Sequence, residues 1–149
     1  MSIVRLTKEF HFEMAHLLWN YDGPCKNIHG HSYKLFVTVK GQPINDISNP
    51  KHGMLIDFSD LKSIVNSQIV ELFDHAFVLQ QNKKFTSVLE NNEIFGKKII
   101  LDYQPTSENL VVDFAIRIKS QLPDKIKLHS LKLYETSTSF SEWYAEDNE

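Results

Sequence analysis

Cysteine is almost absent from this 149-residue sequence, which contains a single residue of that type, Cys25. One cysteine excludes an internal disulfide, and with it the class of small secreted domains that disulfides hold together. A free thiol is typical of a protein from a reducing compartment. The chemistry of Cys25, rather than its packing, therefore becomes the question.

An excess of charge of one sign is also missing, because 16 basic and 19 acidic side chains leave a net charge of −3. The basic surface of a nucleic-acid-binding protein is not expected. Apolar runs stay well short of the roughly 18 residues that a membrane span needs, and the first residues lack the pattern of a signal peptide. We therefore expect a cytoplasmic protein, and the length predicts one domain over residues 1–149.

Two segments alternate between apolar and polar residues, which is typical of half-buried β-strands. The first runs from Val4 to His16 and the second from His29 to Val39. The apolar positions are Val4, Leu6, Phe10, Phe12 and Met14 in the first segment, and Tyr33, Leu35, Val37 and Val39 in the second. His16, His29 and His31 fall on this apolar side, so we expect all three to point inward.

Helical periodicity marks two later segments, and a strand follows them. The expected elements are a helix from Ser59 to about Phe73, a helix that begins at Thr106 or Ser107 and ends near Leu122, a possible short strand within Gly96–Tyr103, and a last strand from Ile126 to about Thr136. The predicted buried stripes are Leu61, Ile64, Val65, Ile69 and Leu72 in the first helix, and Leu110, Val111, Phe114, Ala115 and Ile118 in the second. This order favours an α+β fold in which two helices cover one face of an antiparallel sheet.

Three inward-facing histidines on neighbouring strands indicate a metal site. His29 and His31 share a face because they are two residues apart, and a hairpin brings His16 opposite them. Imidazole nitrogens are preferred ligands of zinc, and three protein ligands with an open fourth position are typical of catalytic zinc. Two alternatives remain: Cys25 could close the site as a fourth, structural ligand, or the histidines could be ordinary hydrogen-bonded core residues.

Several motifs along the chain carry a more specific signal. They are F-x-x-A-H at Phe12–His16, C-x-x-x-H-G-H-x-Y at Cys25–Tyr33, Asp74-His75, Pro105-Thr106-Ser107-Glu108-Asn109, and L-Y-E-T-S-T-S at Leu133–Ser139. Together, and in this order, they resemble the 6-pyruvoyl-tetrahydropterin synthase family, to which the 6-carboxy-tetrahydropterin synthases of queuosine biosynthesis belong.

The resemblance implies a fold, an assembly and a reaction. The fold is the tunnelling fold, of ββααββ order, whose subunits join edge to edge into trimers or hexamers with active sites between subunits. The substrate is the small molecule 7,8-dihydroneopterin triphosphate, and zinc is the cofactor. The chain looks more like the bacterial branch that makes 6-carboxy-5,6,7,8-tetrahydropterin than the branch that makes the 6-pyruvoyl product.

The resemblance also implies roles for individual residues. His16, His29 and His31 would be the zinc ligands, and Cys25 the general base. The remaining implied residues are Asp74 and His75 as a proton relay, Glu135 as the anchor of the pterin ring, and Thr106 and Ser107 as pterin contacts. Gln80 replaces an asparagine that is frequent in the family, and the segment Gln81–Asp102 looks longer than in compact members, which leaves its role open.

Some of these residues are open to plainer interpretations. Glu135 shares the parity of Leu131 and Leu133, so it faces inward, where a carboxylate needs a partner, unless the strand end simply reaches solvent. Asp74 and His75 at a helix end could be a capping pair. Three functional hypotheses follow: a zinc-dependent pterin lyase, a zinc hydrolase, for which the sequence contains no H-E-x-x-H motif, and a non-catalytic zinc-stapled binding module.

Overall fold

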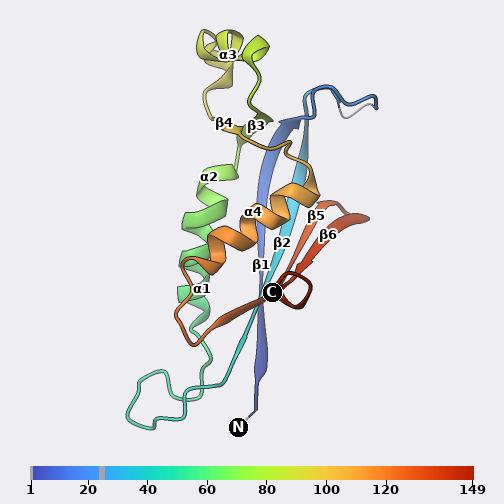
Figure 1. The fold of residues 1–149 in the computed structure, drawn as a ribbon. Helices are drawn as coiled ribbons and strands as arrows, with labels where there is room; N and C mark the ends of the chain where they lie inside the picture. Colours follow the sequence, from blue (N-terminus) through green and yellow to red (C-terminus); the bar gives the residue numbers. More distant parts are fainter. Residues whose placement is uncertain (1, 24–25) are drawn as a thin grey trace.

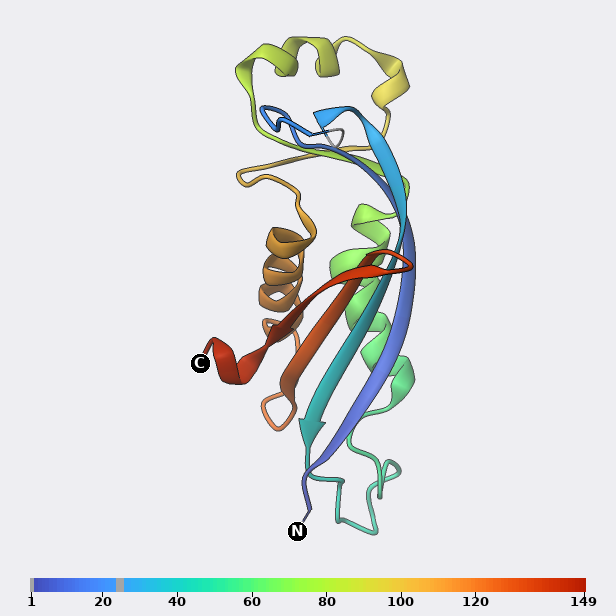
Figure 2. The ribbon, with the colours of Figure 1, turned by 90° about the vertical axis from the view of Figure 1, so that its right-hand side faces the viewer.

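The computed structural model describes residues 2–23 and 26–149, and within them six strands form one sheet in the order β4, β3, β1, β2, β5, β6. The strands are β1 (Val4–Leu17), β2 (His29–Gly41), β3 (Ala76–Gln80), β4 (Lys98–Leu101), β5 (Lys127–Thr136) and β6 (Ser139–Tyr144). The helical elements are α1 (Phe58–Val65), the π-helical turn η2 (Asn66–Val70), α2 (Glu71–Phe73), α3 (Lys83–Glu90), η3 (Glu93–Phe95), α4 (Ser107–Lys119) and η4 (Ala145–Asp147). The predicted α+β class is confirmed: α1, α2 and α4 lie along one face of the curled sheet (Figures 1 and 2).

The central strands pair as the alternation predicts. β1 and β2 are antiparallel in unbroken register from Val4 opposite Gly41 to His16 opposite His29. β2 with β5, and β5 with β6, are antiparallel as well. At the other edge β3 runs parallel to β1, and β4 parallel to β3, so the sheet is mixed. The parallel pairing follows from the helical crossover. α1 and α2 carry the chain along the sheet to the last residues of β1, where β3 begins in the same direction as β1.

The first helical rod extends from Phe58 to Phe73 as α1, η2 and α2 without a break. Every fourth residue of it is buried: Leu61, Val65, Ile69 and Phe73. A spacing of four exceeds the 3.6 residues of an α-helical turn, and the wider π turn keeps these side chains on one side. Leu72 belongs to the predicted helical pattern but is exposed, because the extra residue in the turn brings Phe73 to the core instead.

The second long helix, α4, has the predicted start and the predicted buried stripe. Thr106 is its N-cap, and the hydroxyl oxygen accepts a hydrogen bond from the backbone N–H of Asn109 at 3.2 Å. The buried residues include Leu110, Val111, Phe114, Ala115 and Ile118. The start of α4 matters for the site, because the residue before the cap, Pro105, contacts a histidine of β1.

Aromatic rings join the two helices to the strands that carry the histidines. Phe114 meets Phe73 and Phe12 edge to face, at ring-centroid distances of 5.0 and 6.0 Å. Phe12 stacks on Tyr33 at 5.1 Å, and Tyr33 is two residues from His31. Because such pairs prefer fixed ring geometries, this cluster holds the ends of β1 and β2 in place.

The opposite face of the sheet carries a smaller apolar cluster at the same end. Its buried residues are Phe77, Leu79 and Leu89, with Ala15, Leu17, Phe85 and Phe95 packed against them. Three of these side chains come from α3 and η3, which lie within the segment Gln81–Asp102 and cover this end of the sheet (Figures 1 and 2). The described residues contain no helix that is both long and apolar enough to cross a membrane.

We expect Phe114→Ala to lower the free energy of unfolding by about 3–5 kcal/mol, because it removes a fully buried ring from the contact between both helices and the sheet. Ile116→Ala on the same helix is the matched control, since Ile116 is 64% exposed. Its effect should stay within about 0.5 kcal/mol. Denaturant unfolding of both variants measures the difference, and equal losses would contradict the described packing of α4.

Candidate functional site

Three histidines converge where β1 ends and β2 begins. The register places His16 opposite His29, and His31 lies two residues further along β2. The rings of these residues are 4.5–5.2 Å apart, centroid to centroid. The His16 side chain is 0% exposed, as its inward parity predicts. The structure thus brings together the three residues for which the sequence predicts a metal.

The hydrogen bonds of His16 and His29 fix the state of both rings. Nδ1 of His16 donates to the carbonyl of Pro105 at 2.8 Å, and Nδ1 of His29 donates to the carbonyl of Asn27 at 2.7 Å. Because a carbonyl oxygen only accepts, a neutral ring held in this way presents a lone pair at Nε2. Backbone carbonyls in these positions are typical outer partners of metal-binding histidines.

The two Nε2 atoms face one another at 2.9 Å. Burial lowers the pKa of His16 to about 4; the bond to Pro105 opposes this shift, and the nearby His29 and His31 add to it. The His16 ring is therefore neutral at neutral pH. Two lone pairs at this distance repel, so the pair needs a positive species between its nitrogens, either a shared proton or a metal ion.

Glu135 adds a carboxylate to this group. Its Oε1 lies 3.1 Å from Nε2 of His31 and 3.4 Å from Nε2 of His16. The ligand atoms of the three histidines and Glu135 all lie within 4.8 Å of one another, so the four residues could hold a metal ion. Burial lowers the pKa of His31, and the charge of Glu135 opposes that shift. Within the described residues Nε2 of His31 is buried and forms no hydrogen bond, and its polar neighbour is Oε1 of Glu135.

Glu135 lies on the inward side that its parity with Leu131 and Leu133 predicts, and the pairing of β5 with β2, with Tyr134 opposite Lys34, places it near the histidines. The register between β5 and β6 shifts between Tyr134 and Thr136, so Glu135 lies at an irregularity of the ladder. The irregularity does not move Glu135 to the other face, since its Oε1 still lies close to His16 and His31. Glu135 was predicted to bind a pterin ring, and the structure makes it a candidate metal ligand as well.

Asp74 and His75 form a second group, at the turn between α2 and β3. Asp74 Oδ1 accepts from the backbone N–H of Glu13 at 2.8 Å, and the N–H of His75 donates to the carbonyl of Glu13 at 2.6 Å. Asp74 Oδ2 lies 3.0 Å from Nδ1 of His75. The Glu13 N–H is the main cause of a lowered pKa of Asp74, to which His75 also contributes. The His75 side chain is 77% exposed, so its ring is free to meet another molecule.

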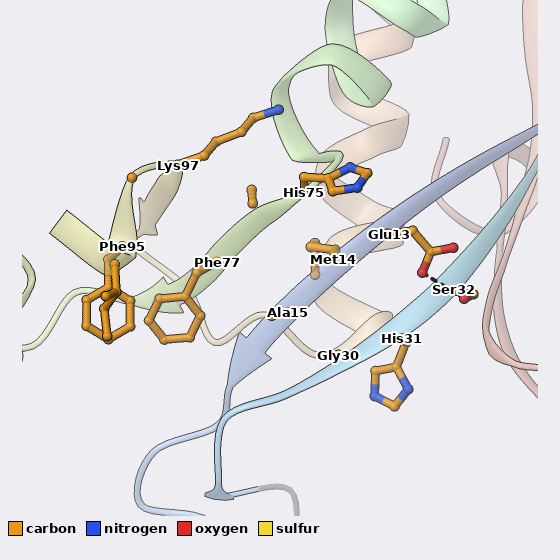
Figure 3. A pocket seen from close by; sticks show the side chains of 13 residues that line it. Glu13, Met14, Ala15, Gly30, His31, Ser32, His75, Phe77, Phe95 and Lys97 are labelled. Atoms are coloured by element: carbon orange, nitrogen blue, oxygen red, sulfur yellow. Dashed lines mark hydrogen bonds between the residues drawn. The ribbon is translucent and has the colours of Figure 1, made fainter.

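This second group borders a pocket of about 400 Å³ on the sheet face that α1 and α4 do not cover (Figure 3). The labelled residues around it include Glu13, Ala15, His31, Ser32, His75, Phe77, Phe95 and Lys97. Glu13 and Ser32 have the parity opposite to His16 and His29, and their side chains are hydrogen-bonded at 2.7 Å. In Figure 3, β1 and β2 lie between the ring of His75 and that of His31. His75 and His31 therefore border one pocket, whereas His16 and His29 do not line it.

Of the remaining predicted residues, Thr106 and Ser107 lie near the histidines, and Cys25 lies outside the residues that the structure describes. Thr106 caps α4, and the carbonyl of the buried Ser107 accepts from the hydroxyl of Ser141 at 3.0 Å. Pro105 connects this turn to His16. Cys25 lies outside the described residues, so its predicted role as a base, and the alternative that it is a fourth ligand, both stay predictions.

Comparison with known proteins gives one consistent family. The family described as "6-pyruvoyl tetrahydropterin synthase" matches residues 5–146. A curated protein of Haemophilus influenzae named 6-carboxy-5,6,7,8-tetrahydropterin synthase is 39% identical over 145 residues, which cover 93% of this chain and 97% of the relative. A protein of the same name from Rickettsia typhi is 30% identical over 146 residues, with 94% and 99% covered.

Solved structures support the fold. An uncharacterized protein from Wolinella succinogenes aligns with a TM-score of 0.80 at 20% identity, covering 97% of this chain and 99% of that one. The 6-pyruvoyl tetrahydropterin synthase of Caenorhabditis elegans aligns with a TM-score of 0.68 at 24% identity, covering 97% of both chains. With a family match over nearly its whole length, the chain belongs to the 6-pyruvoyl tetrahydropterin synthase family and has the tunnelling fold that its motifs predict.

Proposed function

We propose that this protein is a zinc-dependent pterin lyase that converts 7,8-dihydroneopterin triphosphate to 6-carboxy-5,6,7,8-tetrahydropterin, the step that belongs to queuosine biosynthesis. The observation that carries the proposal is the convergence of His16, His29 and His31, with the Nε2 atoms of the first two facing each other at 2.9 Å. The names of the curated relatives support the 6-carboxy product.

Zinc fits the donor set at this site. Three imidazole nitrogens and one carboxylate oxygen are ligands that Zn²⁺ accepts, and two of the rings are oriented by backbone carbonyls. When bound, the ion would polarise the oxygens of the substrate side chain and make the adjacent C–H more acidic. Glu135 is then available for either of two partners, the ion or the substrate.

Proton transfer falls to Cys25, Asp74 and His75 in this proposal. Cys25, four residues before His29, removes the proton as a thiolate, because a nearby cation lowers the pKa of a thiol. His75 returns protons to the substrate, and Asp74 orients its ring through the 3.0 Å contact at Nδ1. An imidazole suits this task because it titrates close to neutral pH.

Pterin binding falls to Glu135, Thr106 and Ser107. A carboxylate can accept two parallel N–H bonds from the guanidine-like edge of a pterin, and such charge-assisted pairs are strong and specific. Glu135 is only partly exposed and has no lysine or arginine partner among the described residues. The turn at Thr106 and Ser107 lies beside the same site through the contact of Pro105 with His16.

We further propose that the active site forms between copies of the chain in a homo-oligomer, a trimer or a hexamer. The support is geometric: His16 and His29 lie on the helix-covered face of the sheet, whereas the pocket at His75 opens on the other face. A substrate held at the histidines of one copy would meet His75 of a neighbouring copy. We also propose a single domain over residues 1–149 and a cytoplasmic location.

The alternative product is the 6-pyruvoyl compound, formed by loss of triphosphate without cleavage of the side chain. The family description and the Caenorhabditis elegans structure carry that name, which is the reason to keep it. A second alternative is not an enzyme. It is a binding module in which Cys25 is a fourth zinc ligand and the ion only stabilises the loop.

Zinc binding is tested by thermal unfolding of the metal-free protein. We expect Zn²⁺ at a hundredfold excess over its dissociation constant to stabilise the protein by about 2.7 kcal/mol. His16→Ala should abolish this gain, because it removes the buried nitrogen at the centre of the group. His11→Ala is the control, since the His11 side chain is 66% exposed. An equal gain in both variants would contradict the site.

The reaction is tested by incubating the zinc-loaded protein with 7,8-dihydroneopterin triphosphate and identifying the products. Acetaldehyde with a carboxypterin is the expected result, and a 6-pyruvoyl product would select the alternative. Cys25→Ala should keep its zinc content while turnover is lost, because a base and not a ligand is removed. Loss of zinc in this variant would favour the stapled module.

The shared site is tested by mixing two inactive variants. His16→Ala lacks a metal ligand and His75→Ala lacks the relay, so each should be inactive alone. In oligomers assembled from equal amounts of both, about one site in four should combine an intact histidine group with an intact relay from a neighbour. Mixtures that stay as inactive as the separate variants would show that both groups must come from one copy.

A further inference from the structure

The segment Gln81–Asp102 contains Lys97 directly before β4. The side chain of Lys97 points back toward the start of β3. Figure 3 shows Lys97 extending from the residues before β4 toward the end of α2, beside His75. Its Nζ donates to the carbonyl of Glu71 at 2.8 Å and to that of Asp74 at 2.5 Å. One ammonium group therefore binds two carbonyls at the turn that carries the relay.

These carbonyls need a partner from outside the helix. The last carbonyls of a helix have no backbone N–H partner within the helix, and the negative end of the helix dipole favours a cation there. α2 ends at Phe73, and the backbone N–H of Asp74 still bonds back to Val70 at 2.9 Å. Lys97 thus completes the end of α2 from a segment more than twenty residues later in the chain.

The backbone at the turn is unusual, which makes a fixed partner necessary. His75 has φ = 60°, in the left-handed region that residues other than glycine rarely adopt. On one side Glu13 holds the turn through the N–H of His75 and the carboxylate of Asp74. On the other side Lys97 holds the carbonyl of Asp74, the group directly before the strained residue.

Lys97 is itself held firmly from several directions. Its carbonyl accepts from the N–H of Phe77 at 2.9 Å, and Lys98 pairs with Phe77 as β4 begins. The rings of Phe95 and Phe77 lie 5.3 Å apart, within the apolar cluster that α3 and η3 form on this face. The segment therefore anchors the lysine relative to β3, which starts one residue after His75.

We propose that Lys97 is a positioning residue for His75, and that the segment Gln81–Asp102 serves to deliver it to the end of α2. This inference rests on the proposed function, in which His75 transfers protons. The charge of Lys97 also contributes, after the Glu13 N–H bond and the contact with His75, to the lowered pKa of Asp74, which keeps that carboxylate ionised to orient the ring. Lys97 itself need not touch the substrate.

Steady-state kinetics of three variants test this role. Lys97→Met should lower kcat by at least about tenfold with KM within about twofold of the wild type, because a displaced relay slows proton transfer without weakening binding. Lys97→Arg should restore most of kcat, since a guanidinium can still donate to both carbonyls. Lys98→Met is the matched control: Nζ of Lys98 bonds the carbonyl of Leu89 near the end of α3, and its loss should leave kcat unchanged.

Hydrogen–deuterium exchange gives a readout that does not need activity. In the peptide covering residues 70–78, the N–H groups of Asp74 and His75 are protected by the bonds to Val70 and Glu13. Lys97→Met should exchange there about tenfold faster than the wild type or Lys98→Met, because the turn opens more often. If Lys97→Met does not fold, Lys97→Gln, whose side chain is shorter and carries no charge, has the same expectations.

The outcomes separate the two proposals. An inactive wild type would overturn the proposed function, and the exchange measurement would still decide whether Lys97 holds the turn. With an active wild type, unchanged kcat and exchange in Lys97→Met would overturn the role of Lys97. So would a loss of kcat that Lys98→Met shares or that Lys97→Arg fails to restore.

Discussion

The antiparallel pairing of β1 with β2 is the constraint on which the rest of the structure depends. Its register is unbroken from Val4 opposite Gly41 to His16 opposite His29, so both strands keep their apolar residues on one face. A slip of one residue would move every side chain of a strand to the other face and would separate His16 from His29. The same register lets Phe12 and Tyr33 stack, and Phe12 in turn contacts Phe114 of α4. Core packing and the histidine group are therefore two consequences of one pairing.

The two faces of this sheet have different chemistry. The helix-covered face ends in imidazole nitrogens, two of whose rings are oriented by Pro105 and Asn27 at Nδ1. The other face ends in a turn that presents an exposed imidazole, held by Glu13 on one side and Lys97 on the other. Within one chain, His16 and His29 lie on the helix-covered face, and the His75 ring borders the pocket on the other face. In the proposed oligomer, a neighbouring copy would supply the second group to the same substrate.

Much of this could be predicted from sequence, and the failures have local physical causes. Alternation identified β1 and β2, and the Pro-Thr-Ser motif identified the cap of α4. Alternation missed β3, because its residues Ala76 to Leu79 are buried on both faces and show no period of two. The helical period misplaced Leu72, since a π turn cannot be read from the residues that form it. Parity gave the inward side of Glu135, but its position beside the histidines depends on the pairing of β5 with β2, two segments far apart in the chain.

The sequence by itself determined the inward parity of His16, His29 and His31, the family, and the residue types available for metal and proton chemistry, because these depend on order and spacing along one strand or helix. Tertiary structure decided which of those residues meet. His75 borders the same pocket as His31 but not His16 or His29, and Lys97 reaches α2 because the apolar cluster at Phe77 and Phe95 folds the segment back. Such contacts join residues far apart in the chain. Their energies come from burial and pairing in three dimensions, so a local sequence pattern cannot predict them.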